Sequence, residues 1–277
     1  MQLNTHLKQS DKMTALKPRL LNELEPRART NSFTGLAELS GDPVVWLGQL
    51  AESREESLEF DSLLTDDERI RRDRFKCRPD QQRFAAGRAW LRVLLGAYLG
   101  LPPHQVILQY GDFGKPSVQR SVQTPAIYFN VAHSGDVVLL AFHGSCELGV
   151  DVEQFKVKQD WNDVARQLFP PERFARWAAL EDNNRQSAFY QEWTQREAGL
   201  KAIGCGFAME QPAGWDSQLT FFDVEVPIGY AGSVAVRPTP RGQFSVSRQE
   251  SRNLVARLCL VTGCLEALPP VLARSGG

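Results

Sequence analysis

The hydrophobic and polar positions of the chain follow two periods, one typical of α-helices and one typical of β-strands. Thr65 followed by Glu68 is a capping-box pattern at the start of one helical segment. Gly100 follows the next helical segment as a helix-ending glycine. The buried stripe predicted for that second segment consists of Leu91, Leu94, Leu95 and Tyr98. The predicted helices cover residues 64–75, 81–99, 161–168, 171–180 and 185–203.

Short runs rich in β-branched and aromatic residues predict strands between and after these helices. Two of the runs are separated only by residues 133–136, His-Ser-Gly-Asp, which favours a tight hairpin. Residues 111–116 are typical of a turn. The predicted strands cover residues 43–47, 106–110, 127–132, 137–142, 148–153, 219–226, 232–236, 244–246 and 254–260.

This order of elements contains a coarse repeat. Each half of the chain has a long predicted helix with an aromatic residue near its start (Phe84, Phe189) and glycines at its end, followed by strands. The pattern predicts an α+β fold made of two similar halves. We expect a flexible N-terminal extension at residues 1–42, an N-terminal half at 43–145 and a C-terminal half at 146–277.

Composition adds few constraints. The chain has 277 residues, and its 32 basic and 33 acidic residues leave a net charge of -1, so no overall field favours nucleic acid or an anionic membrane. Five scattered cysteines indicate reduced thiols: Cys77, Cys146, Cys205, Cys259 and Cys264. The polar N-terminus and an apolar run of only 137–142 predict a soluble, cytoplasmic protein.

Two carboxylates lie close together in the predicted strand at 148–153. Asp151 and Glu153 are two residues apart and therefore project from one face, whereas Val150 and Val152 project from the other toward a core. Two neighbouring carboxylates repel each other unless a cation lies between them, and a hard divalent cation prefers oxygen ligands. An edge strand with a solvated acidic face explains the same pattern.

A third carboxylate lies on the predicted helix at 185–203. Trp193, Glu197 and Lys201 are spaced by four residues and share one face of that helix. A glutamate four residues before a lysine is also an ordinary helix-stabilising pair. Taken alone, this pair therefore indicates no particular chemistry.

Taken together and in order, these motifs resemble those of the 4'-phosphopantetheinyl transferases. The resemblance is to the larger surfactin-synthetase-activating type, which is built from two fused halves. The matching segments span residues 64–207, about half the chain. They are Arg83-Phe-Ala-Ala-Gly-Arg-Ala-Trp-Leu-Arg, Gly114-Lys-Pro, Phe129-Asn-Val-Ala-His-Ser-Gly, Gly149-Val-Asp-Val-Glu and Trp193-x-x-x-Glu-x-x-x-Lys-Ala-x-Gly.

The resemblance implies a pseudo-twofold monomer whose active site lies between the halves and moves the phosphopantetheine arm of coenzyme A to a carrier-protein serine. It implies that Asp151, Glu153 and Glu197 hold Mg²⁺, which also binds the coenzyme pyrophosphate. Glu197, or a water that it orients, is then the general base. Lys201 is expected to bind phosphate and to offset charge on the leaving 3',5'-ADP.

The resemblance also implies contacts to coenzyme A from His133, Lys115, Arg71, Arg83 and Arg88. Without it, His133 is a turn histidine, Lys115 a solvated turn residue and the arginines a solvated helix face. The basic residues in question are Arg69, Arg71, Arg72, Arg74, Lys76, Arg78, Arg83 and Arg88. No groove-reading motif accompanies them, which argues against nucleic-acid binding.

The sequence departs from the family pattern at two positions. Ala132 stands where relatives often have serine, and Glu68 stands where some have a lysine that binds the 3'-phosphate. Phe169 and Phe174 are candidates for exposed aromatic residues at a carrier-docking surface, and both also suit a core.

Three functions therefore stay open from the residues. They are the transferase, another Mg²⁺-dependent enzyme acting on phosphate esters, and a non-catalytic module that binds coenzyme A or a carrier. For the transferase, carriers of fatty-acid, polyketide and non-ribosomal peptide synthases are all candidate partners.

Overall fold

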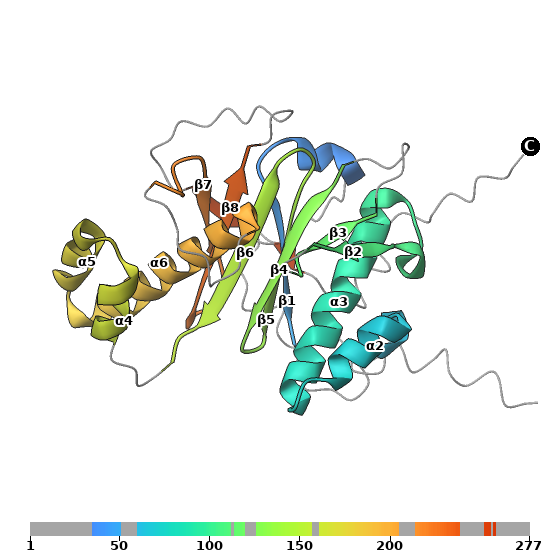
Figure 1. The fold of residues 1–277 in the computed structure, drawn as a ribbon, viewed down its shortest axis with the longest axis horizontal. Helices are drawn as coiled ribbons and strands as arrows, with labels where there is room; N and C mark the ends of the chain where they lie inside the picture. Colours follow the sequence, from blue (N-terminus) through green and yellow to red (C-terminus); the bar gives the residue numbers. More distant parts are fainter. Residues whose placement is uncertain are drawn as a thin grey trace, which may run out of the picture. The chain divides into compact units, whose positions relative to one another are not determined.

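The computed structural model describes residues 35–50, 60–111, 114–119, 126–156, 161–204, 214–238, 252–255 and 257–258 (Figure 1). The predicted extension at residues 1–42 lies mostly outside the described residues. The predicted strand at 244–246 and Cys205, Cys259 and Cys264 lie outside them too. Cys77 and Cys146 are described, and both are free thiols.

The N-terminal half contains a four-stranded sheet with the strand order β10-β1-β5-β4. β4 and β5 form an antiparallel hairpin in which Ser134 pairs with Val137, which confirms the tight hairpin expected from the sequence. β1 is antiparallel to β5 and parallel to β10. The strands are β1 (Val44–Gln49), β4 (Tyr128–Ser134), β5 (Val137–His143) and β10 (Arg257–Leu258).

The C-terminal half contains a second four-stranded sheet with the order β6-β8-β7-β9. β6 pairs antiparallel with β8 along its whole length, and Asp151 lies opposite Ser233. The strands are β6 (Glu147–Gln154), β7 (Thr220–Glu225), β8 (Tyr230–Arg237) and β9 (Arg252–Val255).

The helices follow the sequence prediction with shifted ends. The capping box of Thr65 and Glu68 is present, and Gly100 ends the second helix with a φ of 67°. That helix begins three residues earlier than expected because Pro79 suits a first helical turn. The helices are α2 (Asp66–Asp73), α3 (Arg78–Leu99), α4 (Trp161–Leu168), α5 (Pro171–Ala178) and α6 (Asp182–Ile203).

Shorter elements complete the described fold. The predicted strand at 106–110 is wrong in its first residues. A 3₁₀ turn, η4 (Pro103–Gln105), precedes them, and the strand β2 (Leu108–Tyr110) starts only at Leu108. β2 pairs antiparallel with β3 (Pro116–Val118) in a separate ribbon. A further 3₁₀ turn, η3 (Gly35–Ser40), precedes β1.

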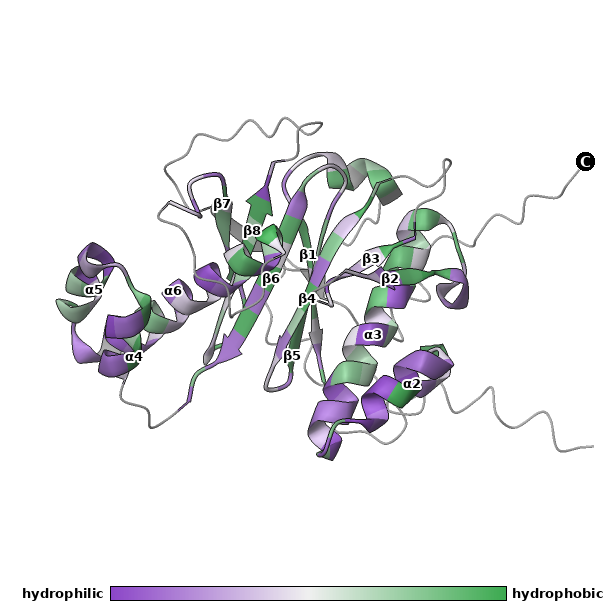
Figure 2. Cartoon of the chain, viewed as in Figure 1, coloured by the Kyte–Doolittle hydropathy of each residue, from purple (hydrophilic) through white to green (hydrophobic). Residues whose placement is uncertain are grey.

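The two sheets share one core, because alternate residues of β5 belong to two hydrophobic clusters. Val138, Leu140 and Phe142 pack with α3, whereas Leu139 packs with residues of β6, β7 and β8. On the far side of the second sheet, alanines of α6 pack with Ala235 of β8. Figure 2 shows hydrophobic colours concentrated in the strands, mixed colours along α3, α4 and α5, and mostly hydrophilic colours over α2.

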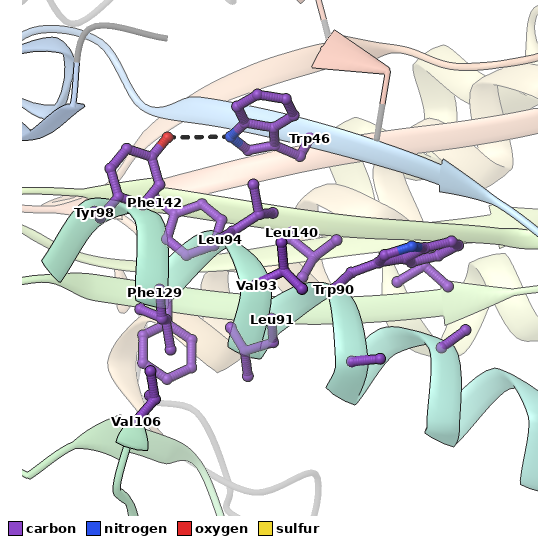
Figure 3. Close-up of a cluster of buried hydrophobic side chains, with 14 of the residues drawn as sticks. Trp46, Trp90, Leu91, Val93, Leu94, Tyr98, Val106, Phe129, Leu140 and Phe142 are labelled. Carbon is purple, nitrogen blue, oxygen red and sulfur yellow. Dashed lines mark hydrogen bonds between the residues drawn. The ribbon is translucent and has the colours of Figure 1, made fainter. Parts of the chain in front are cut away.

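The cluster around α3 is drawn in Figure 3. All four residues of the predicted stripe are buried. The hydroxyl of Tyr98 accepts a hydrogen bond of 3.1 Å from the indole nitrogen of Trp46, so this polar pair is satisfied inside the core. α3 is thereby fixed against β1 and β5.

The structure confirms an α+β fold with two similar halves. In each half, a strand is followed by a 22-residue helix and later by an antiparallel strand pair, and the first strand pairs with the second member of that pair: β1 with β5 of β4–β5, and β6 with β8 of β7–β8. The separate β2–β3 ribbon is an addition to the N-terminal half. Gly204 ends α6 with a φ of 80°, as Gly100 ends α3. β10 pairs with β1, so the C-terminal stretch also contributes a strand to the N-terminal sheet. The division into segments at residues 42 and 145 stays a prediction.

Candidate active site

β6 presents its residues to two different environments. Val150 and Val152 are fully buried in the core between the sheets, as their alternation predicts. Asp151 and Glu153 project from the opposite face, toward α6 and the β4–β5 hairpin. Asp151 is only 5% exposed, so the expectation of a solvated acidic face is wrong for this residue.

α6 lies against this face of β6 because Gly149 has no side chain. A Cβ atom at Gly149 would lie 2.1 Å from the carbonyl oxygen of Ala198 and 2.5 Å from the nitrogen of Ala202. Both are backbone atoms of α6, so any larger residue forces the helix away from the strand. This close approach brings Glu197 and Lys201 of α6 next to Asp151.

A buried hydroxyl pair also fixes α6 on the sheet. Thr194 and Ser233 are both fully buried, and their hydroxyl oxygens are 2.9 Å apart. Because Ser233 lies opposite Asp151 in the β6–β8 pairing, this pair lies beside the carboxylate. Gln191 extends the contact by donating to the Ser233 hydroxyl at 3.0 Å.

Lys201 and Asp151 form an ion pair at this junction. The Lys201 ammonium donates to Asp151 Oδ1 at 2.6 Å and to the carbonyl oxygen of Val150 at 3.1 Å. Asp151 Oδ2 and Glu197 Oε1 are both buried, and neither has a hydrogen-bond partner among the described residues. Two buried carboxylate oxygens therefore have unused acceptor capacity.

The electrostatics of the two carboxylates reflect this arrangement. Burial raises the pKa of Asp151 to about 6, and the charge of Lys201 opposes that rise. Burial and then the neighbouring Asp151 raise the pKa of Glu197 to about 7, with Lys201 and Arg196 acting in the opposite direction. A bound cation at this face favours the ionised forms of both groups.

Glu153 is the third expected carboxylate, and it is held by the other half of the chain. Its Oε2 accepts a hydrogen bond of 2.8 Å from the hydroxyl of Ser134 in β4. Within the described residues, no group of three His, Cys, Asp or Glu side chains is arranged to hold a metal ion as it stands. Instead, other side chains of the protein occupy these carboxylates: Lys201 pairs with Asp151, and Ser134 donates to Glu153.

The β4–β5 hairpin carries His133 and contacts Arg83. His133 is the second-last residue of β4 rather than a turn residue. Although the residue is exposed, desolvation of its ring lowers the pKa of His133, and Lys201 and Arg83 act in the same direction. Arg83 Nε donates to the carbonyl oxygen of Gly135 at 2.6 Å, and Arg83 Nη1 donates to Asp80 at 2.8 Å.

Lys115 also reaches across to β6. Gly114 has a φ of 76°, and its amide donates to the Gly111 carbonyl oxygen at 2.8 Å, which confirms a turn at Gly-Lys-Pro. The Lys115 ammonium donates to Glu147 Oε2 at 2.9 Å and to the carbonyl oxygen of Leu148 at 3.1 Å. In this structure Lys115 is therefore bound at the start of β6.

Arg71 and Arg88 flank a pair of aromatic rings. The Arg71 guanidinium lies 5.3 Å from the ring centre of Tyr110 and 5.8 Å from that of Phe84. Arg88 lies 5.5 Å from the Phe84 ring centre. Its side chain is 10% exposed, and burial lowers its pKa. Arg88 Nε lies 3.5 Å from Glu68, and its Nε and Nη1 have no hydrogen-bond partner among the described residues.

The other basic residues of α2 have mainly local partners. Arg69 pairs with Asp66 at 2.7 Å, and Arg72 pairs with Asp61 and Asp73. The interpretation as a solvated helix face therefore suits Arg69, whose side chain is 40% exposed, better than Arg72, whose side chain is 18% exposed. Arg71 alone of the three lies on the aromatic pair.

Glu68 has a structural role in this chain. Its two carboxylate oxygens accept hydrogen bonds of 2.7 and 3.0 Å from Arg92, and the residue is 4% exposed. Glu68 Oε2 also accepts from the amide of Thr65 at 2.9 Å. This bidentate pair joins α2 to α3 and replaces any contact that a lysine here makes to phosphate.

Phe169 is not available as a docking residue. It is 7% exposed and packs in a cluster with Trp177 and Phe189. Phe174 is half-buried against Trp177, with the Arg166 guanidinium 5.0 Å from its ring centre. The expectation of an exposed aromatic residue is therefore wrong for Phe169.

The sequence did not identify three residues that shape this site: Ser134, Gly149 and Tyr110. Ser134 and Gly149 are part of the quoted motifs, but no role followed from their types alone. Tyr110 is at the end of a predicted strand, and the sequence contains no signal that it contacts Arg71.

None of the helices in the described part of the chain has the length and apolar character that a membrane span needs.

Comparison with known proteins gives two family matches that follow one another along the chain. Residues 51–145 match the model for the N-terminal domain of 4'-phosphopantetheinyl transferases. Residues 147–259 match the model of the 4'-phosphopantetheinyl transferase superfamily. The two alternative functions, a different phosphate-ester enzyme and a non-catalytic module, are not favoured by these matches.

Individual relatives have the same family name. The 4'-phosphopantetheinyl transferase HetI of Nostoc is 33% identical over 173 residues, which cover 62% of this chain and 73% of HetI. A putative 4'-phosphopantetheinyl transferase of Synechocystis is 37% identical over 150 residues, 54% of this chain and 60% of the relative. The 4'-phosphopantetheinyl transferase Sfp of Bacillus subtilis is 26% identical over 157 residues, 57% of this chain and 67% of Sfp. The chain thus belongs to the 4'-phosphopantetheinyl transferase superfamily, a family whose partners are coenzyme A and a carrier protein.

Proposed function

We propose that this transferase moves the 4'-phosphopantetheine arm of coenzyme A to a serine of an acyl or peptidyl carrier protein and releases 3',5'-ADP. It is then an enzyme of the holo-[acyl-carrier-protein] synthase type. The observation that supports this most strongly is the pair of buried, unpartnered oxygens, Asp151 Oδ2 and Glu197 Oε1.

The donor set fits Mg²⁺. Asp151, Glu153 and Glu197 offer carboxylate oxygens only, which suits a hard cation that also binds phosphate oxygens and water. Buried carboxylates whose pKa values are raised to about 6 and about 7 are destabilised in their ionised forms, so a cation offsets a cost that the site already has. When bound, the ion neutralises charge on the pyrophosphate of coenzyme A.

Glu197 is the proposed base for the carrier serine, either directly or through a water that it orients. A carboxylate whose pKa is raised to about 7 is well matched to proton transfer near neutral pH. Lys201 is two-thirds buried and lies on the same side of α6. Its ammonium, now paired with Asp151, is the proposed partner for phosphate oxygens and for charge on the leaving 3',5'-ADP.

The basic residues supply the proposed coenzyme contacts. Arg88 is partly buried, and two of its nitrogen atoms are buried with unused donor capacity within the described structure, which fits an anionic group such as a phosphate. Arg71 lies beside it over Tyr110. His133 and Arg83 are at the β4–β5 hairpin, which contacts the end of β6, whereas Lys115 contacts the start of that strand. All three are proposed to contact coenzyme A.

Further features of the proposal follow from the arrangement of the chain. One chain supplies both halves of the site, so we infer a monomer. Carriers of fatty-acid, polyketide and non-ribosomal peptide synthases are all candidate substrates, and a cytoplasmic location is part of the proposal.

A transfer reaction tests the function. The protein is incubated with coenzyme A, Mg²⁺ and each of a panel of apo carriers, and intact masses are measured. We expect at least one carrier to gain the mass of a single phosphopantetheine arm, with release of 3',5'-ADP that depends on that carrier. No mass gain on any carrier class contradicts the proposal, and 3',5'-ADP release without a carrier indicates hydrolysis instead.

A further inference from the structure

Ser134, the last residue of β4, connects the two halves at the carboxylate face. Its hydroxyl oxygen accepts a hydrogen bond of 3.0 Å from the backbone amide of Gln154. The same hydroxyl lies 2.8 Å from Glu153 Oε2. An ionised carboxylate can only accept, so the single hydroxyl proton of Ser134 is directed at Glu153. The direction of both bonds is therefore fixed.

The turn that follows Ser134 is held in place from both halves. Arg83 of α3 donates to the carbonyl oxygen of Gly135 at 2.6 Å. The amide of Asp136 donates to the hydroxyl of Tyr230 in β8 at 3.2 Å. Gly135 has a φ of 53°, and a Cβ there would lie 2.4 Å from the Tyr230 hydroxyl. The hairpin therefore has little freedom to move away from β6.

These contacts limit where the Glu153 carboxylate can lie. Glu153 is half-buried, and a glutamate side chain has three rotatable bonds that must be ordered before it can bind an ion. The bond from Ser134 occupies one of its two carboxylate oxygens and leaves the other to a cation. His133, the neighbouring residue on β4, belongs to the same fixed segment.

We propose that Ser134 is a positioning residue for magnesium binding: its hydroxyl orients Glu153 across the junction of the two halves. This inference rests on the proposed function, because it takes Glu153 to be a ligand of the ion. Groups that hydrogen-bond to metal ligands typically change metal affinity by about 10- to 100-fold when they are removed. Ser134 is in that position relative to Glu153.

The test measures Mg²⁺ dependence directly, by calorimetric titration of coenzyme A at a series of Mg²⁺ concentrations. Ser134→Ala removes the hydroxyl and Ser134→Thr keeps it. Ser187→Ala is the matched control, because Ser187 is an exposed serine of α6 with only a local bond to the Asn184 carbonyl oxygen. A parallel series measures transfer rates, which separates Mg²⁺ half-saturation from the rate at saturating Mg²⁺.

We expect Ser134→Ala to raise the Mg²⁺ concentration for half-saturation by about 10-fold or more, in binding as in transfer. Ser134→Ala should change the Mg²⁺ concentration for half-saturation more than the transfer rate at saturating Mg²⁺. Ser134→Thr, which keeps the hydroxyl, should have a half-saturation close to that of the unmodified protein. Ser187→Ala should match the unmodified protein. If Ser134→Ala does not fold, the pair Ser134→Thr and Ser134→Val is compared instead, since these side chains differ by one hydroxyl group.

Two results are distinguishable. Unchanged Mg²⁺ half-saturation in folded Ser134→Ala, together with a clear loss in Glu153→Gln, overturns the role of Ser134 and leaves the proposed function standing. Unchanged half-saturation in Glu153→Gln removes Glu153 from the metal site, and it overturns the proposed role of Ser134 at the same time.

Discussion

At the scale of residues, the described structure places an energetic conflict at Glu197. The side chain is 7% exposed, has an unpartnered oxygen and lies near Asp151, which is itself buried. Burying a carboxylate without a partner costs free energy in its ionised form. Such costs are typical of functional sites, where a ligand supplies the missing partner.

The pH dependence of stability follows from this conflict. The folded-state pKa of Glu197, about 7, lies above the ordinary value of 4.5. Folding therefore favours the protonated form, and its contribution to stability is present below about pH 4.5 and is lost as the pH rises through about 7. The metal-free protein should lose this contribution across that range.

Replacing Glu197 by Gln should remove the loss. At pH 8 with a chelator present, we expect Glu197→Gln to be more stable than the unmodified protein by roughly 1–3 kcal/mol, with a smaller difference at pH 5. Urea unfolding at the two pH values measures this. Glu225→Gln, at the exposed end of β7, is the charge-matched control. A Glu197→Gln protein less stable than the unmodified one at pH 8 contradicts the assignment of a strained carboxylate.

At the scale of elements, the site depends on how closely α6 approaches β6. Gly149 allows this approach, and the hydroxyl pair of Thr194 and Ser233 fixes the helix along the strand. The elements themselves, including the hairpin and both long helices, could be predicted from periodicity and end signals. The approach of helix to strand could not, because a glycine in a strand pattern does not tell which neighbour needs the space.

Gly149→Ala tests this packing. The added methyl group meets backbone atoms of α6, so the helix must shift, and we expect a loss of about 1–3 kcal/mol in unfolding free energy. The shift also separates Glu197 from Asp151, so Mg²⁺-dependent binding of coenzyme A should weaken. Both quantities are measured on one preparation, by urea unfolding and calorimetry.

Gly87→Ala is the control for that substitution. A Cβ at Gly87, in α3, would lie 3.5 Å from a Val138 methyl group, an ordinary contact, and alanine favours a helix by about 0.5–1 kcal/mol. Its stability should equal or exceed that of the unmodified protein. If Gly149→Ala has normal stability and binds coenzyme A normally, the close packing of α6 on β6 does not determine the position of Glu197 relative to Asp151.

At the scale of the whole described fold, the two similar halves contribute different side chains to the proposed site. The C-terminal half contributes Asp151, Glu197 and Lys201, and the N-terminal half contributes Ser134 and the basic residues around Tyr110. Sequence periodicity predicted the repeat and the α+β class. It did not predict that β10 joins the first sheet, because strand pairing across most of the chain leaves no local signal.

Long-range contacts within the candidate site also leave no local signal in the sequence. Motif order brought together Asp151, Glu153 and Glu197, and the fold places all three around one junction. The partners that hold them in the ligand-free protein, Lys201 for Asp151 and Ser134 for Glu153, follow only from three-dimensional contacts.

The most direct test of the proposed metal face is the affinity for coenzyme A with and without Mg²⁺, measured by calorimetry on the unmodified protein, Asp151→Asn and Glu197→Gln. We expect Mg²⁺ to tighten coenzyme binding to the unmodified protein by about 5- to 150-fold, the usual range for coupling between two ligands. Both variants should lose most of that gain while they stay folded. An equal Mg²⁺ effect in all three proteins would contradict the account, because the ion would then bind without the carboxylates of β6 and α6.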